Sequence, residues 1–111
     1  MQYLGTFQSD KLINYFFIYG DMTIILYDDN IEDGTHNIRF QLKYNGYYRY
    51  GDELEYSFPV TFKNKHITFT IMTKDIEDIL IVNLDFEENI LQGTYSIDQD
   101  YDNGSVILNK E

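Results

Sequence analysis

The chain has 111 residues, and its 19 acidic against 8 basic residues give a formal net charge of −11. This length suits one domain, residues 1–111, and a content of 43% hydrophobic and 17% aromatic residues argues against disorder. The lack of cysteine excludes a disulfide framework and a thiolate metal site, and the negative charge disfavours direct binding to nucleic acid or to a membrane surface.

The expected location is the cytoplasm. The start, Met1–Gly5, lacks the basic and long apolar regions of a signal peptide. The longest strongly apolar run, Tyr15–Tyr19, is too short to span a bilayer as a helix. The Asn-, Ile- and Tyr-rich composition points to an AT-rich bacterial or phage genome, so the expected compartment is that of a bacterial or phage-infected host cell.

The first predicted elements form a hairpin over residues 12–27, which turns at Gly20-Asp21 in a type II′ geometry. Both faces of this hairpin are apolar. Either the rest of the domain covers it, or one face forms an interface. In the second case we expect a homodimer through Tyr15, Phe17 and Tyr19, because Tyr and Phe are favoured at interface cores.

Alternation with a period of two dominates the rest of the chain and predicts half-buried strands. Pro59 falls inside the second alternating run, which should therefore be an edge strand or carry a bulge. The inward-facing sets are Ile38/Phe40/Leu42/Tyr44, Leu54/Tyr56/Phe58/Val60/Phe62, Ile67/Phe69/Ile71, Leu80/Val82/Leu84/Phe86, Tyr95/Ile97 and Val106/Leu108.

The predicted reversals separate these runs at short, regular intervals, and only residues 74–78 suit a turn of helix. They lie at Asp33-Gly34, Asn45-Gly46, Lys63-Asn64-Lys65, Glu87-Glu88-Asn89 and Asn103-Gly104. The fold class is therefore all-β, with about 8–10 antiparallel strands in a meander barrel or a two-sheet sandwich, since either arrangement removes exposed edges.

The closing segments, residues 91–96 and 104–110, combine a Gly-x-Tyr strand with a Gly-x-hydrophobic-x-Leu strand. This pattern resembles the last hairpin of small calycin-type barrels, the lipocalin and avidin group. The resemblance implies an up-and-down barrel with an apolar ligand cavity, and hence an alternative function as a small-molecule-binding protein. Such a cavity would be lined by Phe40, Leu42, Phe69, Ile71, Val82 and Leu84, although small barrels usually fill their interior with side chains.

No residue set predicts a cofactor, a metal centre or catalysis. Asp98, Asp100 and Asp102 alternate as in a calcium loop, but the loop has glycine at its seventh position and Asn109 at its twelfth, so an acidic hairpin is the simpler interpretation, with calcium left open. His36 and His66 are expected to point outwards, and catalysis would need a cleft where a carboxylate meets one of them. We therefore expect a protein that is not an enzyme.

Charge and aromatic residues instead indicate protein recognition. Sixteen of the 19 acids fall in five clusters at predicted turns, and residues 75–109 hold nine acids but no Lys or Arg. If the C-terminal hairpins gather on one side, their carboxylates would form a face for a basic protein surface. The composition resembles that of bacterial immunity proteins and phage inhibitors of defence nucleases. The expected contact residues are Asp85, Glu87, Glu88, Asp98, Asp100 and Asp102 for charge, with Tyr47, Tyr48 and Tyr50 as anchors.

Overall fold

The computed structural model describes residues 1–10, 19–27, 32–45, 51, 53–72, 79–97 and 102–111, with Asp102 in its backbone only. These residues form eight strands, and none of them belongs to a helix long and apolar enough to cross a membrane. The strands are β1 (Gln2–Ser9), β2 (Tyr19–Leu26), β3 (Gly34–Tyr44), β4 (Glu53–Phe62), β5 (His66–Met72), β6 (Ile79–Glu87), β7 (Ile90–Ile97) and β8 (Asp102–Lys110).

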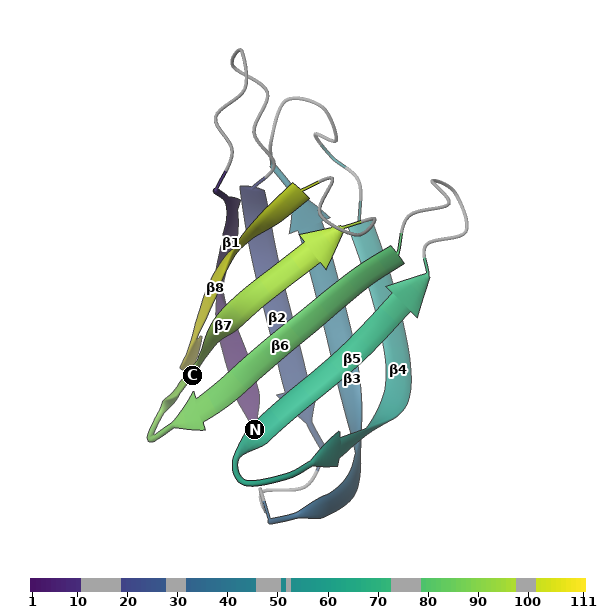
Figure 1. Cartoon of the computed structure of the whole chain (residues 1–111), viewed down its shortest axis with the longest axis vertical. Helices are drawn as coiled ribbons and strands as arrows, with labels where there is room; N and C mark the ends of the chain where they lie inside the picture. Colours follow the sequence, from purple (N-terminus) through teal and green to yellow (C-terminus); the bar gives the residue numbers. More distant parts are fainter. Residues whose placement is uncertain (11–18, 28–31, 46–50, 52, 73–78, 98–101) are drawn as a thin grey trace.

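All eight strands belong to one sheet with the order β4-β3-β2-β1-β8-β7-β6-β5, and every neighbouring pair is antiparallel. The sheet coils until its two edge strands, β4 and β5, come side by side (Figure 1). The prediction of an all-β meander is confirmed, and of its two forms the nearly closed barrel is the one adopted. Pro59 lies on an edge strand, as its missing amide donor requires.

The alternating pattern sets which side chains enter the barrel. Along β3, Ile38, Phe40, Leu42 and Tyr44 are buried, whereas the residues between them are at least partly exposed. The same rule holds along β5, β6 and β7, and along β8 for the described side chains up to Asn109. The six residues considered as a cavity lining are also buried, and the Phe40 and Phe69 rings meet edge to face at 5.2 Å. Side-chain packing therefore fills the interior between these two rings.

Two glycines let the β1–β8 junction close tightly. A Cβ on Gly5 would lie 1.9 Å from the carbonyl oxygen of Ile107, and one on Gly104 would lie 2.0 Å from that of Gln8. The Gly104 position would also meet the Tyr95 ring at 2.4 Å, and Tyr95 packs edge to face on Phe7 with centroids 5.4 Å apart. Glycine at these inward positions allows the backbones and the aromatic core to approach each other.

The turn predictions have mixed outcomes. Reversals at Lys63–Lys65 and Glu87–Asn89 are confirmed, with positive φ at Asn64, Lys65 and Glu88. The predicted turn at Gly20-Asp21 is wrong, because Gly20 pairs inside β2 with both Phe7 and Tyr44.

The predicted turn at Asn103-Gly104 is also wrong. Both residues lie inside β8, where Asn103 pairs with Ser96 and Gly104 with Tyr95. In this position glycine serves close packing, not a positive φ. The predicted helical turn at residues 74–78, and Gly46 of the Asn45-Gly46 turn, lie outside the described residues.

Candidate protein-interaction surface

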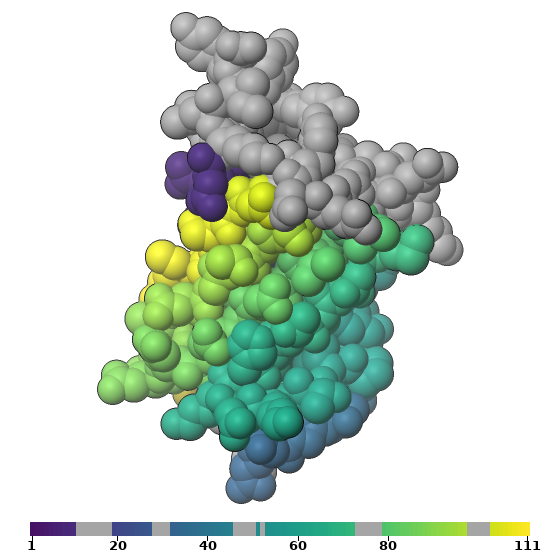
Figure 2. Space-filling view, in the orientation of Figure 1, coloured from purple at the N-terminus to yellow at the C-terminus, as the bar shows by residue number. Residues whose placement is uncertain are grey.

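A polar row runs across the outer face of β5, β6 and β7. Strand registers place Asp85 of β6 between His66 of β5 and Gln92 of β7, and place Asn83 between Thr68 and Thr94. All of these side chains point outwards, because they alternate with the buried residues of the same strands. Figure 2 shows this face, with β5 in teal, β6 and β7 in green and β8 in yellow.

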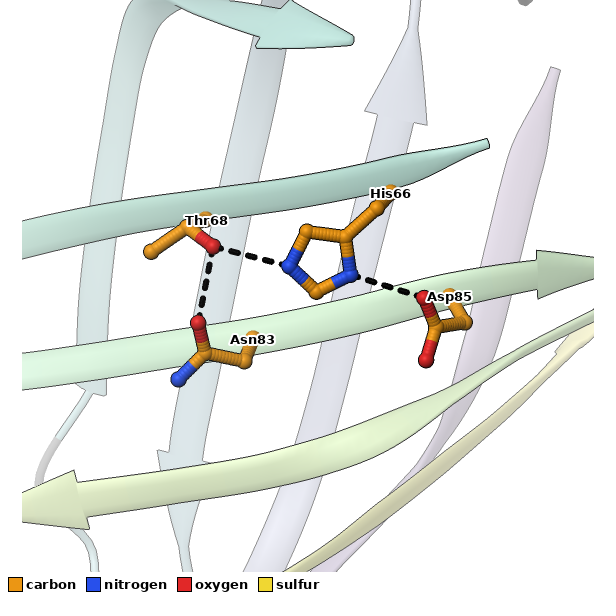
Figure 3. A network of polar contacts seen from close by, with 4 residues as sticks. All are labelled: His66, Thr68, Asn83 and Asp85. Carbon is orange, nitrogen blue, oxygen red and sulfur yellow. Dashed lines mark hydrogen bonds and ion pairs between the residues drawn. The ribbon is translucent and has the colours of Figure 1, made fainter. Parts of the chain in front are cut away.

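Four residues of this row form a connected hydrogen-bond network (Figure 3). His66 Nδ1 lies 2.7 Å from Asp85 Oδ1, and its Nε2 lies 3.0 Å from Thr68 Oγ1. The Thr68 hydroxyl donates to Asn83 Oδ1 at 2.7 Å. The His66 imidazole thus connects Asp85 to Thr68, and the Thr68 hydroxyl connects the imidazole to Asn83.

The order carboxylate, imidazole, hydroxyl is also that of a nucleophilic triad. Catalysis at His66 would need a carboxylate beside the imidazole within a cleft, and Asp85 supplies the carboxylate. A triad further needs a cleft that holds the substrate and donors for the oxyanion. Here the His66 and Asp85 side chains are 42% and 62% exposed, and the two hollows described below include none of the four network residues. Both side chains of the His66–Asp85 pair are thus accessible to solvent on the outer face of the sheet.

His36, the other histidine, lies elsewhere and was placed wrongly. It was expected to point outwards, but position 36 has the same parity as the inward-facing Ile38. Its ring lies on Phe62 with centroids 4.6 Å apart, and its Nε2 is 2.8 Å from the carbonyl oxygen of Glu32. No three His, Asp or Glu side chains gather as metal ligands within the described part of the chain.

Three predicted acidic contacts lie together at one end of this face. Asp85 and Glu87 point outwards from alternate positions of β6, and Glu88 occupies the following turn with φ of 54°. All three are exposed, and Glu87 Oε2 accepts a hydrogen bond from Gln92 Nε2 at 2.9 Å. Alternate positions of a strand are about 7 Å apart, so Asp85 and Glu87 extend from the same face of β6 at about this spacing.

Of the other predicted acids, Asp102 begins β8 at the opposite end of the barrel. Asp102 begins β8 opposite Ile97, whereas Glu87 lies opposite Ile90, so the length of β7 separates them. Eight residues of strand span roughly 23 Å between the first and last positions. Asp98 and Asp100 lie outside the described residues, as does the side chain of Asp102. The backbone of Asp102 is therefore separated from Glu87 by the length of β7.

The predicted tyrosine anchors Tyr47, Tyr48 and Tyr50 also lie outside the described residues. Their flanking strands end at Tyr44 and begin at Glu53, at the same end of the barrel as Asp102 (Figure 1). Of the residues predicted for a homodimer, Tyr15 and Phe17 are likewise outside, and Tyr19 begins β2 at this end with 39% of its surface exposed.

On the β2–β3–β4 face, bases and acids face each other across the strands. Arg39 of β3 pairs with Glu55 of β4, and Lys43 lies 4.0 Å from Glu53. The register sets Lys43 directly opposite Glu53, whereas Arg39 lies opposite Ser57 and reaches diagonally to Glu55. A hollow of about 460 Å³ lies on this side, with Asp21, Lys43, Glu53 and Glu55 among its lining residues.

Apolar side chains also reach the outside of the barrel. Leu4 of β1, Ile107 of β8 and Ile90 of β7 are 37%, 51% and 36% exposed. Ile90, Phe86 and the carboxylates Glu87 and Glu88 line a second hollow of about 450 Å³, together with Lys65. The acidic end of β6 thus adjoins an apolar surface.

Comparison with protein-family models, with curated proteins and with solved structures finds no match for this chain.

Proposed function

We propose that this chain is a non-catalytic interaction protein that binds a basic surface of a larger, nucleic-acid-handling protein. It would act as an inhibitor of the anti-defence or immunity type, in the cytoplasm of a bacterial or phage-infected cell. Its primary contact is the acidic end of the outer face, formed by Asp85, Glu87 and Glu88. The whole molecule carries a formal net charge of −11, which attracts cationic partners and repels nucleic acid.

This proposal rests on a difference in how acidic and basic side chains are paired on the two sides of the barrel. On the β3–β4 side each of two bases faces an acid in the same sheet. The segment 75–109 has no Lys or Arg, so β6, β7 and the turn between them supply no base, and the basic residue that lines the hollow beside Glu87 and Glu88 is Lys65 of the β4–β5 turn. With Asp85, Glu87 and Glu88 against Lys65, this end keeps an excess of acids that a basic partner can meet.

The opposite end of the barrel supplies a second expected contact. Asp98 and Asp100 belong to the β7–β8 connection, and Asp102 begins β8. Tyr47, Tyr48 and Tyr50 belong to the β3–β4 connection, and the strand ends that flank both connections lie at the same end of the barrel. A partner that touched both ends would lie along the β6–β8 face. A smaller partner would use the Glu87 end alone.

The test is retention of a partner from the native cell on the immobilised chain at about 50 mM salt, with elution at rising salt. The partner is then purified and its affinity measured for wild type and for the double variant Glu87→Lys/Glu88→Lys. We expect the double variant to bind about tenfold or more weakly, because charge reversal converts attraction to repulsion at the contact.

A second double variant, Asp10→Lys/Asp21→Lys, has the same net charge and changes two exposed acids nearer the opposite end of the barrel, one directly after β1 and one on β2. It should retain binding to within about twofold, apart from the general loss of long-range attraction. Equal losses in both variants, or an affinity that salt does not change, would contradict the assignment of the contact to this end of the barrel.

A further inference from the structure

The barrel has a seam where β4 and β5 meet. These are the two end strands of the sheet, and a single bridge, Lys63 with His66, connects their hairpin within the described residues. The amide of Lys63 donates to the carbonyl of His66 at 3.0 Å, and the amide of His66 donates back at 2.9 Å. No ladder continues from this bridge along the described parts of β4 and β5.

The hairpin geometry identifies which backbone groups line the seam. Lys63 directs both its N–H and its C=O at β5, and in an antiparallel strand every second residue repeats that direction. The odd-numbered residues of β4 therefore face the seam. Pro59 is one of them, and in a continued ladder it would stand opposite Thr70 without an N–H to donate. Beyond Pro59, the backbone of Ser57, Glu55 and Glu53 faces the seam with donors present.

The side chains along this part of β4 are also less covered than elsewhere in the barrel. Leu54, Tyr56 and Phe58 point inwards but are only partly buried, whereas Val60 and Phe62 near the hairpin are buried. Phe58 reaches across the seam to Phe69 of β5, with ring centroids 5.3 Å apart. The edge thus combines free backbone donors and acceptors with an apolar inner side.

Charge distinguishes between the occupants that could pair with this edge. The outward side chains of its free part are Glu53, Glu55 and Ser57, and all three are exposed. A second copy of the chain would bring another formal charge of −11 to the same place, which disfavours self-pairing. A strand with basic outward residues would instead place its bases beside Glu53 and Glu55, two carboxylates that contact Lys43 and Arg39 from the β3 side and retain acceptor positions for a second base.

We propose that the free edge of β4, from Glu53 to Ser57, binds an extended segment of a partner protein in which basic and apolar residues alternate. The segment adds an antiparallel strand to the sheet. Its apolar side chains cover Leu54 and Tyr56, and its basic side chains lie beside Glu53 and Glu55. This contact is separate from the acidic end at Glu87 and Glu88.

A short peptide of alternating valine and lysine tests this proposal by calorimetric titration at about 50 mM salt. In an antiparallel pair, the outward lysines direct their backbone amides at β4 and the valines direct theirs away. Methylation of the lysine amide nitrogens should weaken binding about tenfold relative to methylation of the valine amide nitrogens, because only the first change removes the inter-strand hydrogen bonds. The two peptides have equal charge and composition.

Two variants test the protein side of the contact. Ser57→Pro removes a seam-facing donor, and Pro59 shows that this edge accommodates proline while its strand still pairs with β3. Ser57→Pro should bind the unmodified peptide about fivefold more weakly than Ser57→Ala, with folding of both checked by thermal unfolding.

Equal binding of the two methylated peptides would overturn the proposal of strand addition. If high salt still abolished binding of these peptides, the function proposed for the acidic end would stand. Loss in Ser57→Pro of a dimer that Ser57→Ala retains, measured by sedimentation, would assign the edge to a second copy and overturn it as well.

Discussion

The β1–β8 junction and the β4–β5 junction close the same barrel by different means. At the first, seven residue pairs run in register from Tyr3 with Lys110 to Ser9 with Gly104. At the second, the hairpin bridge is followed by ring packing between Phe58 and Phe69, without a ladder in the described residues. The residues responsible are glycine on one side, which permits close approach, and proline on the other, which lacks the donor that a ladder needs.

The paired β1–β8 junction therefore helps to specify the fold, whereas the edge of β4 at the β4–β5 junction remains open to a partner. Backbone pairing satisfies each amide within the sheet and leaves nothing for another chain. A strand edge keeps its donors and acceptors available, and natural sheets protect such edges with proline, charge or curvature. Here Pro59 protects the half of β4 near the hairpin, and Glu53 and Glu55 place charge on the other half.

The largest expected effect compares two phenylalanines that touch the same ring. Phe40 and Phe58 lie 5.2 Å and 5.3 Å from Phe69 between ring centroids, but Phe40 is fully buried and Phe58 only partly. Phe40→Ala should lower the free energy of unfolding by about 3–5 kcal/mol. Phe58→Ala should lower it by about 1–2 kcal/mol, because less apolar surface returns to water. Urea denaturation measures the free energy of unfolding of both variants. Equal losses would mean that the β4–β5 seam is packed as firmly as the interior of the barrel.

The second prediction concerns the tight junction itself. In Gly5→Ala the new Cβ would lie 1.9 Å from the Ile107 carbonyl oxygen and 2.7 Å from Leu108 Cα, so backbone must move. We expect a loss of about 2–3 kcal/mol in the free energy of unfolding. Thr6→Ala, at the next and outward-facing position, is the control and should change it by less than about 0.5 kcal/mol. A neutral Gly5→Ala would show that β1 and β8 can separate without cost.

Much of this fold could be predicted from alternation alone. The inward sets of β3 and β5–β8 follow directly from the period of two, and Pro59 correctly marked an edge. The glycine turns failed at Gly20 and Gly104, because glycine in a short motif indicates a turn and a close backbone approach equally well. That β5 forms the other edge could not be read from the sequence, since it depends on how far the sheet coils before its ends meet.

The candidate surface was less accessible to sequence reasoning. Asp85, Glu87 and Glu88 were found as an acidic cluster, but the pairing of Asp85 with His66 depends on the register between β5 and β6. That register has no local signal in the sequence. Separation of Asp102 from Glu87 follows from the length of β7, once the meander is known.

A smaller effect is expected from pH at Tyr3, which lies in the paired β1–β8 junction. Tyr3 of β1 is 1% exposed and packs on Phe86, and burial raises the pKa of its phenol above the ordinary value of 10.0. In the unfolded chain the phenol ionises first. Stability from the neutral phenol is therefore complete below about pH 10 and is lost as pH rises through the folded pKa. Urea denaturation across this range should show a steeper loss for wild type than for Tyr3→Phe, and parallel curves would contradict this.

The smallest expected effect lies beside the seam, in the pair of His66 and Asp85. His66 begins β5 and also forms the hairpin bridge to Lys63, so the pair could hold the β5 edge in place. Because both side chains are substantially exposed, a double-mutant cycle with His66→Ala and Asp85→Asn should give a coupling of only about 0.2–1 kcal/mol. Exchange of the His66 amide proton, which is bonded to the Lys63 carbonyl, should be little changed in either variant. A coupling of several kcal/mol, together with faster exchange of the His66 amide proton in the variants, would contradict this. It would show that the His66–Asp85 network, and not the Phe58–Phe69 contact, keeps the seam closed.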